Sequence, residues 1–330
     1  MPCRNEAAHL RAFFSSVLAQ SLPAEATLEM WIADGASMDG TKQILNEYTT
    51  AYPWVHVIDN PRRIVSTGLN RAIELATGHI IVRMDVHTNY AEDYVAQCVA
   101  VLRETNADNV GGPAQTRSSS YIQEAISAAY HSSFACGGAR FHNVNYEGPV
   151  DTVMFGCWRK DVLQKIGLFD EELVRNQDDE LNFRLLRAGG KIFQSRRIRF
   201  WYKPRASLMA LASQYGQYGY WKVRVIKKHG SPASLRHLVP AAFVLSLLLL
   251  SVASFFTIAA AYALGIVLGV YTLANLVASL AICWHKRHLL PVMPVVLATY
   301  HFSYAFGFLF ALPSAMLSAG GHRNIRAVAK

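Results

Sequence analysis

The fold is decided by two apolar runs, Thr27–Ala33 (TLEMWIA) and His79–Met84 (HIIVRM), which lead into Asp34-Gly35 and Asp85-Val-His87. Short apolar runs that end in turn residues predict buried strands. A third such run, Val55–Asp59, lies between them. The sequence therefore predicts three strands within the first 87 residues.

Helical patterns separate these strands. Apolar residues recur at helical spacing from about Glu6 to Ala19, and further helices are predicted from Thr41, as N-cap, to about Tyr48 and over Ser66–Ala76. Strands that alternate with helices imply an α/β fold with a parallel sheet and right-handed crossovers. Ligands of such sheets bind beyond the carboxyl ends of the strands, where Asp34 and Asp85 lie.

The following residues predict a continuation of this α/β domain. We expect a helix over Ser120–Ala135, a long loop over Cys136–Val150, a strand over Asp151–Gly156, and helices over Lys160–Ile166 and Asp178–Ala188.

Composition separates the chain into two halves. Residues 1–180 hold all 23 acidic residues against 14 Lys and Arg, whereas residues 181–330 hold 18 Lys and Arg and no acid. A chain that is 52% hydrophobic and 17% charged is too apolar for a disordered protein. We expect no nucleic-acid partner, no signal peptide, and reduced thiols for the five cysteines, an odd number without a C-x-x-C pair.

The C-terminal part predicts membrane spans. Leu238–Trp284 contains 47 residues without a charged side chain or histidine, enough for two spans of about 20 residues. The basic loop His285–His288 favours the cytoplasm, which makes residues 1–237 cytoplasmic. A third apolar stretch, Leu289–Gly321, predicts one kinked span, with a re-entrant hairpin as the alternative. Apart from His301, no residue in these spans indicates an ion or substrate pathway, so we interpret them as a membrane anchor.

Acidic residues form two further candidate features. Because side chains alternate along a strand, we expect Asp85 and His87 to face the same side just past the strand end, where they offer an oxygen and an imidazole to a divalent cation. Gln177-Asp-Asp-Glu180 precedes a predicted helix, where acids favour the helix N-terminus, and crowding raises carboxylate pKa values toward those of a general base. Solvated side chains at a loop and helix capping are the alternative interpretations.

Motifs of several enzyme classes do not occur. The sequence has no G-x-G-x-x-G after a strand, no P-loop, no H-E-x-x-H and no G-x-S-x-G.

Six motifs in this order resemble the family 2 inverting glycosyltransferases with the GT-A fold, closest to membrane-attached exopolysaccharide transferases of the succinoglycan-biosynthesis type. They are Pro2-Cys-Arg-Asn-Glu6, Asp34-Gly-Ala-Ser-Met-Asp-Gly-Thr41, Asp85-Val-His87, Phe155-Gly-Cys-Trp-Arg159, Gly167-Leu-Phe-Asp170 and Gln177-Asp-Asp-Glu-Leu181. The resemblance covers residues 1 to about 225.

The resemblance implies roles for particular residues. Arg4, Glu6, Asp34, Asp85 and Gln214 would bind the nucleotide sugar, with Asp34 on the base. Asp85 and His87 would hold Mg²⁺ or Mn²⁺, and Asp178 would be the general base. The acceptor or donor loop would include Gly156, Trp158, Asp179 and Glu180.

The resemblance also implies the activity. One sugar would pass from a nucleotide-diphosphate sugar, with UDP favoured, to a lipid-linked saccharide with inversion, at the inner membrane. A processive polysaccharide synthase and a catalytically impaired, membrane-tethered binding subunit are the alternatives.

Three sequence departures qualify the resemblance. The family has a hydrophobic strand before Pro2, which we expect to be absent here. Gln177 stands where the family commonly has Glu. The role of the arginine in a Gln-x-x-Arg-Trp motif would pass to Lys222 or Arg224, or would be lost.

We expect four regions: a catalytic domain over 1–203, a basic aromatic interfacial segment over 204–237, a transmembrane region over 238–321, and a basic tail over 322–330.

Overall fold

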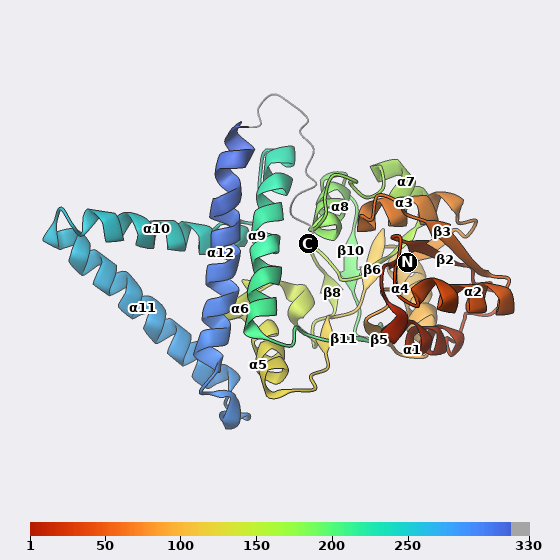
Figure 1. The fold of residues 1–330 in the computed structure, drawn as a ribbon, viewed down its shortest axis with the longest axis horizontal. Coiled ribbons are helices and arrows are strands. Elements are labelled where there is room, and N and C mark those ends of the chain that lie inside the picture. Colours follow the sequence, from red (N-terminus) through yellow and green to blue (C-terminus); the bar gives the residue numbers. More distant parts are fainter. Residues whose placement is uncertain (318–330) are drawn as a thin grey trace. The chain divides into compact units, whose positions relative to one another are not determined.

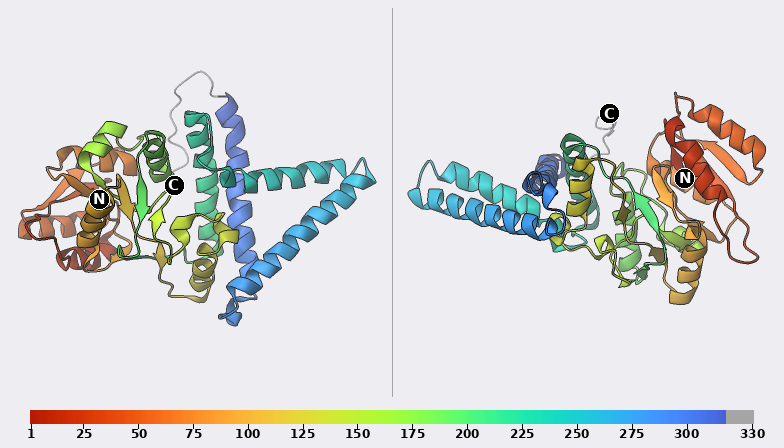
Figure 2. Two further views of the ribbon diagram at one scale, coloured as in Figure 1. Left: turned by 180° about the vertical axis from the view of Figure 1, so that it is seen from behind. Right: turned by 90° about the horizontal axis from the view of Figure 1, so that it is seen from below.

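The structure, a computed structural model, describes the backbone of residues 1–317 and the side chains of residues 1–315. The expected basic tail at 322–330 therefore lies outside the described residues. The chain divides into a first unit, residues 1–116 and 140–203, and a second unit, residues 117–139 and 204–330. We describe each unit by itself (Figures 1 and 2).

The first unit begins with a parallel sheet. Its strands lie in the order β1 (Pro2–Cys3), β2 (Met30–Asp34) and β3 (Val55–Asp59). The connecting helices are α1 (Ala7–Leu18) and α2 (Thr41–Ala51). The parallel arrangement predicted for this part of the chain is confirmed. Thr41 is the first residue of α2 and not its N-cap, which is Gly40.

The expectation of an absent first strand is wrong in part. Pro2 pairs with Ala33 and Cys3 with Asp34, and the Met1 carbonyl accepts a hydrogen bond of 2.8 Å from the amide of Ala33. The strand ends at once because Asn5 adopts a left-handed conformation, with φ of 55°, and turns the chain away. The carboxyl end of β1 thus lies beside that of β2.

Two mixed sheets complete the first unit. One has the order β4-β9-β6-β10-β8 and the other the order β5-β11-β7. The strands are β4 (Ile80–Val82), β5 (Thr88–Tyr90), β6 (Asn109–Gly111), β7 (Gln115–Thr116), β8 (Gly148–Pro149), β9 (Cys157–Arg159), β10 (Ile192–Gln194) and β11 (Phe200–Tyr202). Because β4 pairs antiparallel with β9, the prediction that the parallel sheet extends to residues 79–84 is wrong.

The strand predicted over Asp151–Gly156 is also misplaced. Phe155 and Gly156 have φ values of 65° and 52°, which exclude regular strand geometry, and β9 begins at Cys157. A Cβ at Gly156 would lie 2.2 Å from the Trp158 ring, so this tight bend requires glycine.

Three helices of the first unit begin and end within one residue of their predicted bounds: α3 (Val65–Leu75), α7 (Lys160–Ile166) and α8 (Gln177–Arg187). The helix α4 (Tyr94–Thr105) was not predicted. A short 3₁₀ helix, η1 (Arg140–His142), lies inside the predicted long loop. All five cysteines are free thiols in the structure.

The second unit is helical. It contains α5 (Tyr121–Tyr130), α6 (Ser133–Cys136), α9 (Leu208–His229), α10 (Val239–Ala253), α11 (Ile258–Ile282) and α12 (Met293–Leu317), with 3₁₀ turns η2 (Leu235–His237) and η3 (Arg287–Leu289). The helix predicted over Ser120–Ala135 is interrupted at His131-Ser132. Within the described part of the chain, three helical segments are long and apolar enough to cross a membrane: Leu235–Ala253, Ile258–Ile282 and Met293–Ala315.

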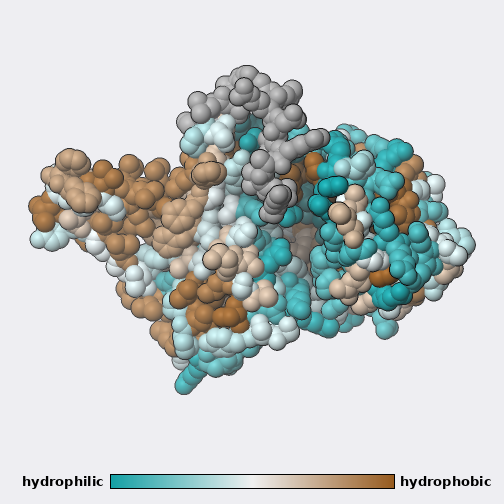
Figure 3. Space-filling model, in the orientation of Figure 1, coloured by the Kyte–Doolittle hydropathy of each residue, from teal (hydrophilic) through white to brown (hydrophobic). Residues whose placement is uncertain are grey.

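The three apolar helices are not equivalent. α10 and α11 project together from the rest of this unit, and hydrophobic side chains cover the face seen in Figure 3. α12 is one continuous helix as far as it is described. It therefore agrees better with the prediction of a single span than with a re-entrant hairpin. In the apolar stretch of α12, 33% of the residues are buried, against 17% in the stretch that includes α10 and 11% in that of α11.

α12 packs along α9. The ring centroids of Tyr215 and Tyr300 lie 4.4 Å apart, and the Lys227 Nζ donates to the Ala315 carbonyl at 2.6 Å, so the two helices run in the same direction. A Cβ at Gly219 would lie 2.0 Å from the Tyr304 carbonyl oxygen. The two backbones therefore approach as closely as glycine allows.

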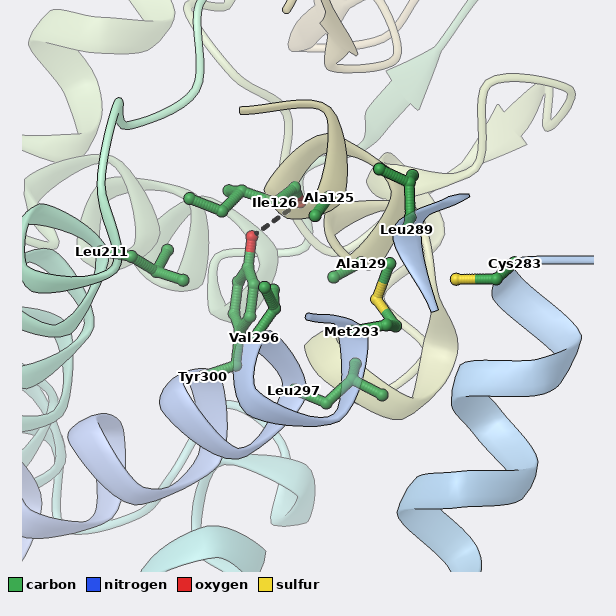
Figure 4. Close-up of a cluster of buried hydrophobic side chains, with 10 residues drawn as sticks. All are labelled: Ala125, Ile126, Ala129, Leu211, Cys283, Leu289, Met293, Val296, Leu297 and Tyr300. Carbon is green, nitrogen blue, oxygen red and sulfur yellow. Dashed lines mark hydrogen bonds between the residues drawn. The ribbon is translucent and has the colours of Figure 1, made fainter. Parts of the chain in front are cut away.

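The amino-terminal end of α12 is built into a core with α5. Ten buried residues form this cluster, and the Tyr300 hydroxyl donates to the Ile126 carbonyl at 3.2 Å (Figure 4). The loop before α12 is fixed to the same helix, because Lys286 and His288 contact the Glu124 carboxylate at 2.8 and 3.2 Å. The hydrogen bond from Lys286, followed by that from His288, holds the pKa of Glu124 below its usual value.

Candidate active site

Two loops at the carboxyl ends of β1 and β2 are joined by hydrogen bonds. The Asn5 amide donates to the Ser37 hydroxyl at 2.9 Å, the Met38 amide to the Asn5 side-chain oxygen at 2.9 Å, and the Glu6 amide to the Thr41 hydroxyl at 2.7 Å. The predicted nucleoside-binding residues Glu6 and Asp34 therefore stand on one rigid pair of loops.

Asp34 is held at the floor of these loops. Its side chain is only 2% exposed and accepts hydrogen bonds from the Ser37 hydroxyl at 2.5 Å and from the Ser37 amide. Lys42 lies 3.9 Å from the same carboxylate. The Arg4 side chain lies beside the next residue, Gly35, where an added Cβ would meet it at 3.2 Å.

A buried arginine connects the predicted metal ligand to the predicted base. The Arg83 side chain is 6% exposed and donates to both oxygens of Asp85, from Nε at 3.2 Å and from a terminal nitrogen at 3.1 Å. Its other terminal nitrogen donates to the Asp178 carboxylate. Such a bidentate pair fixes the orientation of a carboxylate.

Asp178 lies in the first turn of α8, after Asn176, whose φ is 61°. Partial burial raises the pKa of Asp178 above its usual value. The positive charge of Arg83 opposes this rise, and the negative charges of Asp85 and Asp179 add to it. A carboxylate with a raised pKa that keeps 36% of its side chain exposed suits a general base.

Asp85 and His87 contact different partners in the structure. The strand ends at Val82, and Val86-His87 forms a turn in which the Thr88 amide donates to the Asp85 carbonyl at 3.2 Å. Strand alternation therefore does not apply to these two residues. Asp85 turns to Arg83, and the His87 Nε2 lies 2.9 Å from the Glu6 carboxylate.

Asp85 still suits a divalent cation. Its side chain is 27% exposed, and a carboxylate has about four lone-pair positions, of which Arg83 uses two. Oxygen ligands together with an imidazole suit Mn²⁺ as well as Mg²⁺.

The predicted acceptor or donor loop contains residues with clear structural contacts. Trp158 is 3% exposed and packs with Leu69 and Phe169 in a hydrophobic cluster, while Glu180 is fully buried and accepts from Arg184 at 2.8 Å. Gly156 provides the bend before β9, and its carbonyl accepts from the Arg83 amide at 3.1 Å. Asp179 is partly exposed beside the base.

Gln214 belongs to the second unit, whereas the other predicted site residues belong to the first. It lies on α9, and its side-chain nitrogen donates to the Tyr218 hydroxyl at 2.9 Å. Of the two basic residues considered for the missing arginine, Lys222 is 5% exposed, and Arg224 lies over the Tyr220 ring at 5.7 Å.

Sequence reasoning missed Arg83, Asn5 and His9. Arg83 interrupts an otherwise apolar strand, which was the available signal, because a buried charge requires a partner. Asn5 is part of a quoted motif, but only its φ of 55° shows that it forms the turn. His9 lies in the first turn of α1, and its ring is 5.3 Å from that of His87.

Comparison with known proteins agrees with this geometry. A family model described as "Glycosyl transferase family 2" matches residues 1–167. The chain belongs to glycosyltransferase family 2. This glycosyltransferase is 34% identical over 244 residues to the succinoglycan biosynthesis protein ExoA of Rhizobium meliloti (strain 1021), a match that covers 73% of each chain.

A second relative extends into the apolar helices. The glycosyltransferase is 23% identical over 321 residues, 94% of this chain and 95% of the relative, to a protein of Methanococcus voltae. That protein is named dolichyl N-acetyl-alpha-D-glucosaminyl phosphate 3-beta-D-2,3-diacetamido-2,3-dideoxy-beta-D-glucuronosyltransferase.

Solved structures show the GT-A fold of this glycosyltransferase. The mannosyltransferase PcManGT from Pyrobaculum calidifontis, solved with GDP-Man and Mn²⁺, matches with a TM-score of 0.59 and 17% identity over 94% of this chain and 85% of that one. TarS of S. aureus matches with a TM-score of 0.51 and 14% identity over 93% of this chain and 54% of that one.

Proposed function

We propose that this glycosyltransferase moves one sugar, with inversion, from a nucleotide-diphosphate sugar to a lipid-linked saccharide at the cytoplasmic face of the cell membrane. The observation that carries the proposal is the buried guanidinium of Arg83, which holds Asp85 and Asp178 together. Inverting transfer requires the residue that faces the leaving diphosphate and the residue that activates the acceptor to keep fixed positions on either side of one sugar, and Arg83 fixes both carboxylates.

The donor is expected on the loops that follow β1, β2 and β4. Arg4, Glu6 and Asp34 are the nucleoside contacts, with Asp34 on the base, and UDP is the favoured nucleotide. Asp85 is the principal cation ligand, with His87 as the second candidate. When bound, the cation neutralises charge on the departing diphosphate. The mannosyltransferase of Pyrobaculum calidifontis, which was solved with Mn²⁺ and GDP-Man, supports a cation and a nucleotide sugar.

Asp178 acts as the general base. It takes the proton of an acceptor hydroxyl while that oxygen forms a bond to the anomeric carbon of the sugar. The bond from this carbon to the diphosphate breaks, and the nucleoside diphosphate leaves with the electron pair. One such displacement inverts the anomeric configuration. Gly156 and Asp179 are the remaining candidates for contacts with donor or acceptor, and Gln214 for the donor phosphates.

The cytoplasmic placement is supported by the contacts of Glu124. Residues 117–139 leave and re-enter the first unit and are too few to cross a membrane twice. They therefore lie on the same side as the first unit. Lys286 and His288 bind Glu124, so the loop between α11 and α12 lies on this side as well, and its positive charge favours the cytoplasm.

The lipid-linked acceptor is supported by the named activity of the Methanococcus voltae relative, which concerns a dolichyl phosphate sugar. The packing of α9, a part of the predicted interfacial segment 204–237, along the apolar α12 supports an interfacial position for that segment.

The test uses the purified full chain in detergent. A panel of UDP- and GDP-sugars is incubated with Mn²⁺ and a lipid-linked saccharide extract, and nucleoside diphosphate release and product mass are measured. A product longer by one sugar is expected. Long polymers would favour a processive synthase. Donor binding without release or transfer would favour a catalytically impaired binding subunit.

A further inference from the structure

Three side chains outside the Arg83 network converge in the first unit. Glu6 stands before α1, His9 lies in its first turn, and His87 belongs to the turn after β4. One ligand atom of each lies within 4.8 Å of the others. Glu6 and His9 are three positions apart, a spacing that places side chains on one face of a helix.

The Glu6 carboxylate has an unsatisfied oxygen. Its Oε1 lies 2.9 Å from the His87 Nε2, and the side chain is only 12% exposed. Its Oε2 is buried and has no hydrogen-bond partner among the described residues. A buried acceptor without a partner is unfavourable, and a bound cation provides the missing partner.

The ligand set determines the kind of cation. Two imidazoles and one carboxylate suit Zn²⁺ or Co²⁺, whereas Mg²⁺ and Ca²⁺ prefer oxygen ligands. A metal ion of this kind lies about 2.0–2.2 Å from each ligand atom. The ligand atoms of one ion are therefore closer to one another than 4.8 Å, the upper limit of the separations in this cluster. His9 and His87 are exposed, so small rotations of their rings are sufficient to bring the atoms together.

We propose that Glu6, His9 and His87 form a site for a transition-metal ion of the zinc type, distinct from the donor-cation site centred on Asp85 and sharing with it only the candidate ligand His87. An ion bound at this site holds the His87 ring beside Glu6. Neither side chain is then available to bind the donor or its cation. Zinc therefore inhibits transfer. The inhibition rests on the proposed function, whereas the binding of the ion does not.

The first measurement is metal binding without nucleotide. The full chain in detergent is titrated with Co²⁺, which is followed by its visible absorption, and the bound Co²⁺ is then displaced by Zn²⁺. The variant His9→Gln removes one ligand, and His79→Gln removes an exposed histidine outside the cluster as a matched control. The variant Asp85→Asn alters the principal donor-cation ligand and leaves the three proposed zinc ligands in place.

The expected result is one Co²⁺ equivalent displaced by Zn²⁺ in the wild type, His79→Gln and Asp85→Asn, with affinity at least about tenfold weaker in His9→Gln. In transfer assays with Mn²⁺, His9→Gln should need at least about ten times more zinc for half inhibition. Equal Co²⁺ affinity of a folded His9→Gln and the wild type would overturn the site. Absent transfer with intact Co²⁺ binding would count against the proposed function alone.

Discussion

The guanidinium of Arg83 donates to the carboxylate of Asp178, 95 positions away in the sequence, while its other nitrogens bind Asp85. A fixed positive charge thus stands between the two acids proposed for cation binding and for base catalysis. Burial alone would lower the pKa of Arg83, and the charges of Asp178 and Asp85 more than reverse this effect. Arg83 therefore stays protonated at every pH at which transfer is measured.

The first prediction concerns pH. Arg83 opposes the raised pKa of Asp178, so Arg83→Gln should raise that pKa further and move the acid limb of the kcat profile to higher pH. Arg83→Lys keeps the charge and should shift the limb less. Rate–pH profiles of the three proteins at saturating Mn²⁺ provide the check. An acid limb that moves down in Arg83→Gln would contradict the role assigned to Arg83.

The second prediction concerns the donor cation. Asp85→Ala should abolish transfer and remove the dependence of donor binding on metal, because His87 alone does not hold a hard cation against a diphosphate. Mn²⁺ should support the wild type at least as well as Mg²⁺, since imidazole suits the softer ion. Calorimetric titration with the nucleotide sugar, with and without Mn²⁺, measures both effects.

The matched control is Asp59→Asn, an exposed acid at the end of β3. It should bind donor as the wild type does. An unchanged response to Mn²⁺ in Asp85→Ala would remove Asp85 from the cation site.

The third prediction concerns the contact of α9 with α12. Gly219→Ala places a Cβ 2.0 Å from a carbonyl oxygen of α12, so the helices must move apart, and we expect a loss of about 1–3 kcal/mol. Gly265→Ala, on α11, meets nothing within 4 Å and should not destabilise, because alanine favours helices by about 1 kcal/mol. Thermal unfolding in detergent compares the two. Equal unfolding temperatures would show that the close contact does not form.

The fourth prediction concerns orientation. Phe255, between α10 and α11, and Trp284, after α11, are exposed at opposite ends of α11. In intact cells, a membrane-impermeant thiol reagent should label Phe255→Cys, and should label Trp284→Cys only after permeabilisation. Labelling of Trp284→Cys in intact cells would place the basic loop outside and reject the cytoplasmic active site.

Much of the first unit follows from local sequence. The apolar spacing of Leu10, Phe13, Phe14 and Val17 predicts the buried face of α1, and the run Val55–Asp59 is β3 itself. The candidate site residues Asp34, Asp85 and Asp178 belong to motifs whose order along the chain identifies the family. These features depend on neighbours in the sequence or on the motif as a whole, so they are visible without a structure.

Other features depend on distant partners. The position of β9 follows from positive φ values at Phe155 and Gly156, and the turn of His87 toward Glu6 follows from the end of β4 at Val82. The basic and aromatic composition of residues 204–237 indicates an interface but not the contact of Gly219 with α12. These tertiary contacts join residues far apart in the sequence, so no local sequence pattern predicts them.

The most direct test of the central claim is the variant Asp178→Asn, with Asp179→Asn as the matched neighbour. If Asp178 is the base, its replacement should leave nucleotide-sugar binding nearly unchanged and lower kcat by at least about 10²-fold. Asp179→Asn should keep most of the activity. The wild-type product should have an inverted anomeric configuration. Retention of more than a tenth of the rate in Asp178→Asn, with Asp179→Asn inactive, would contradict this account.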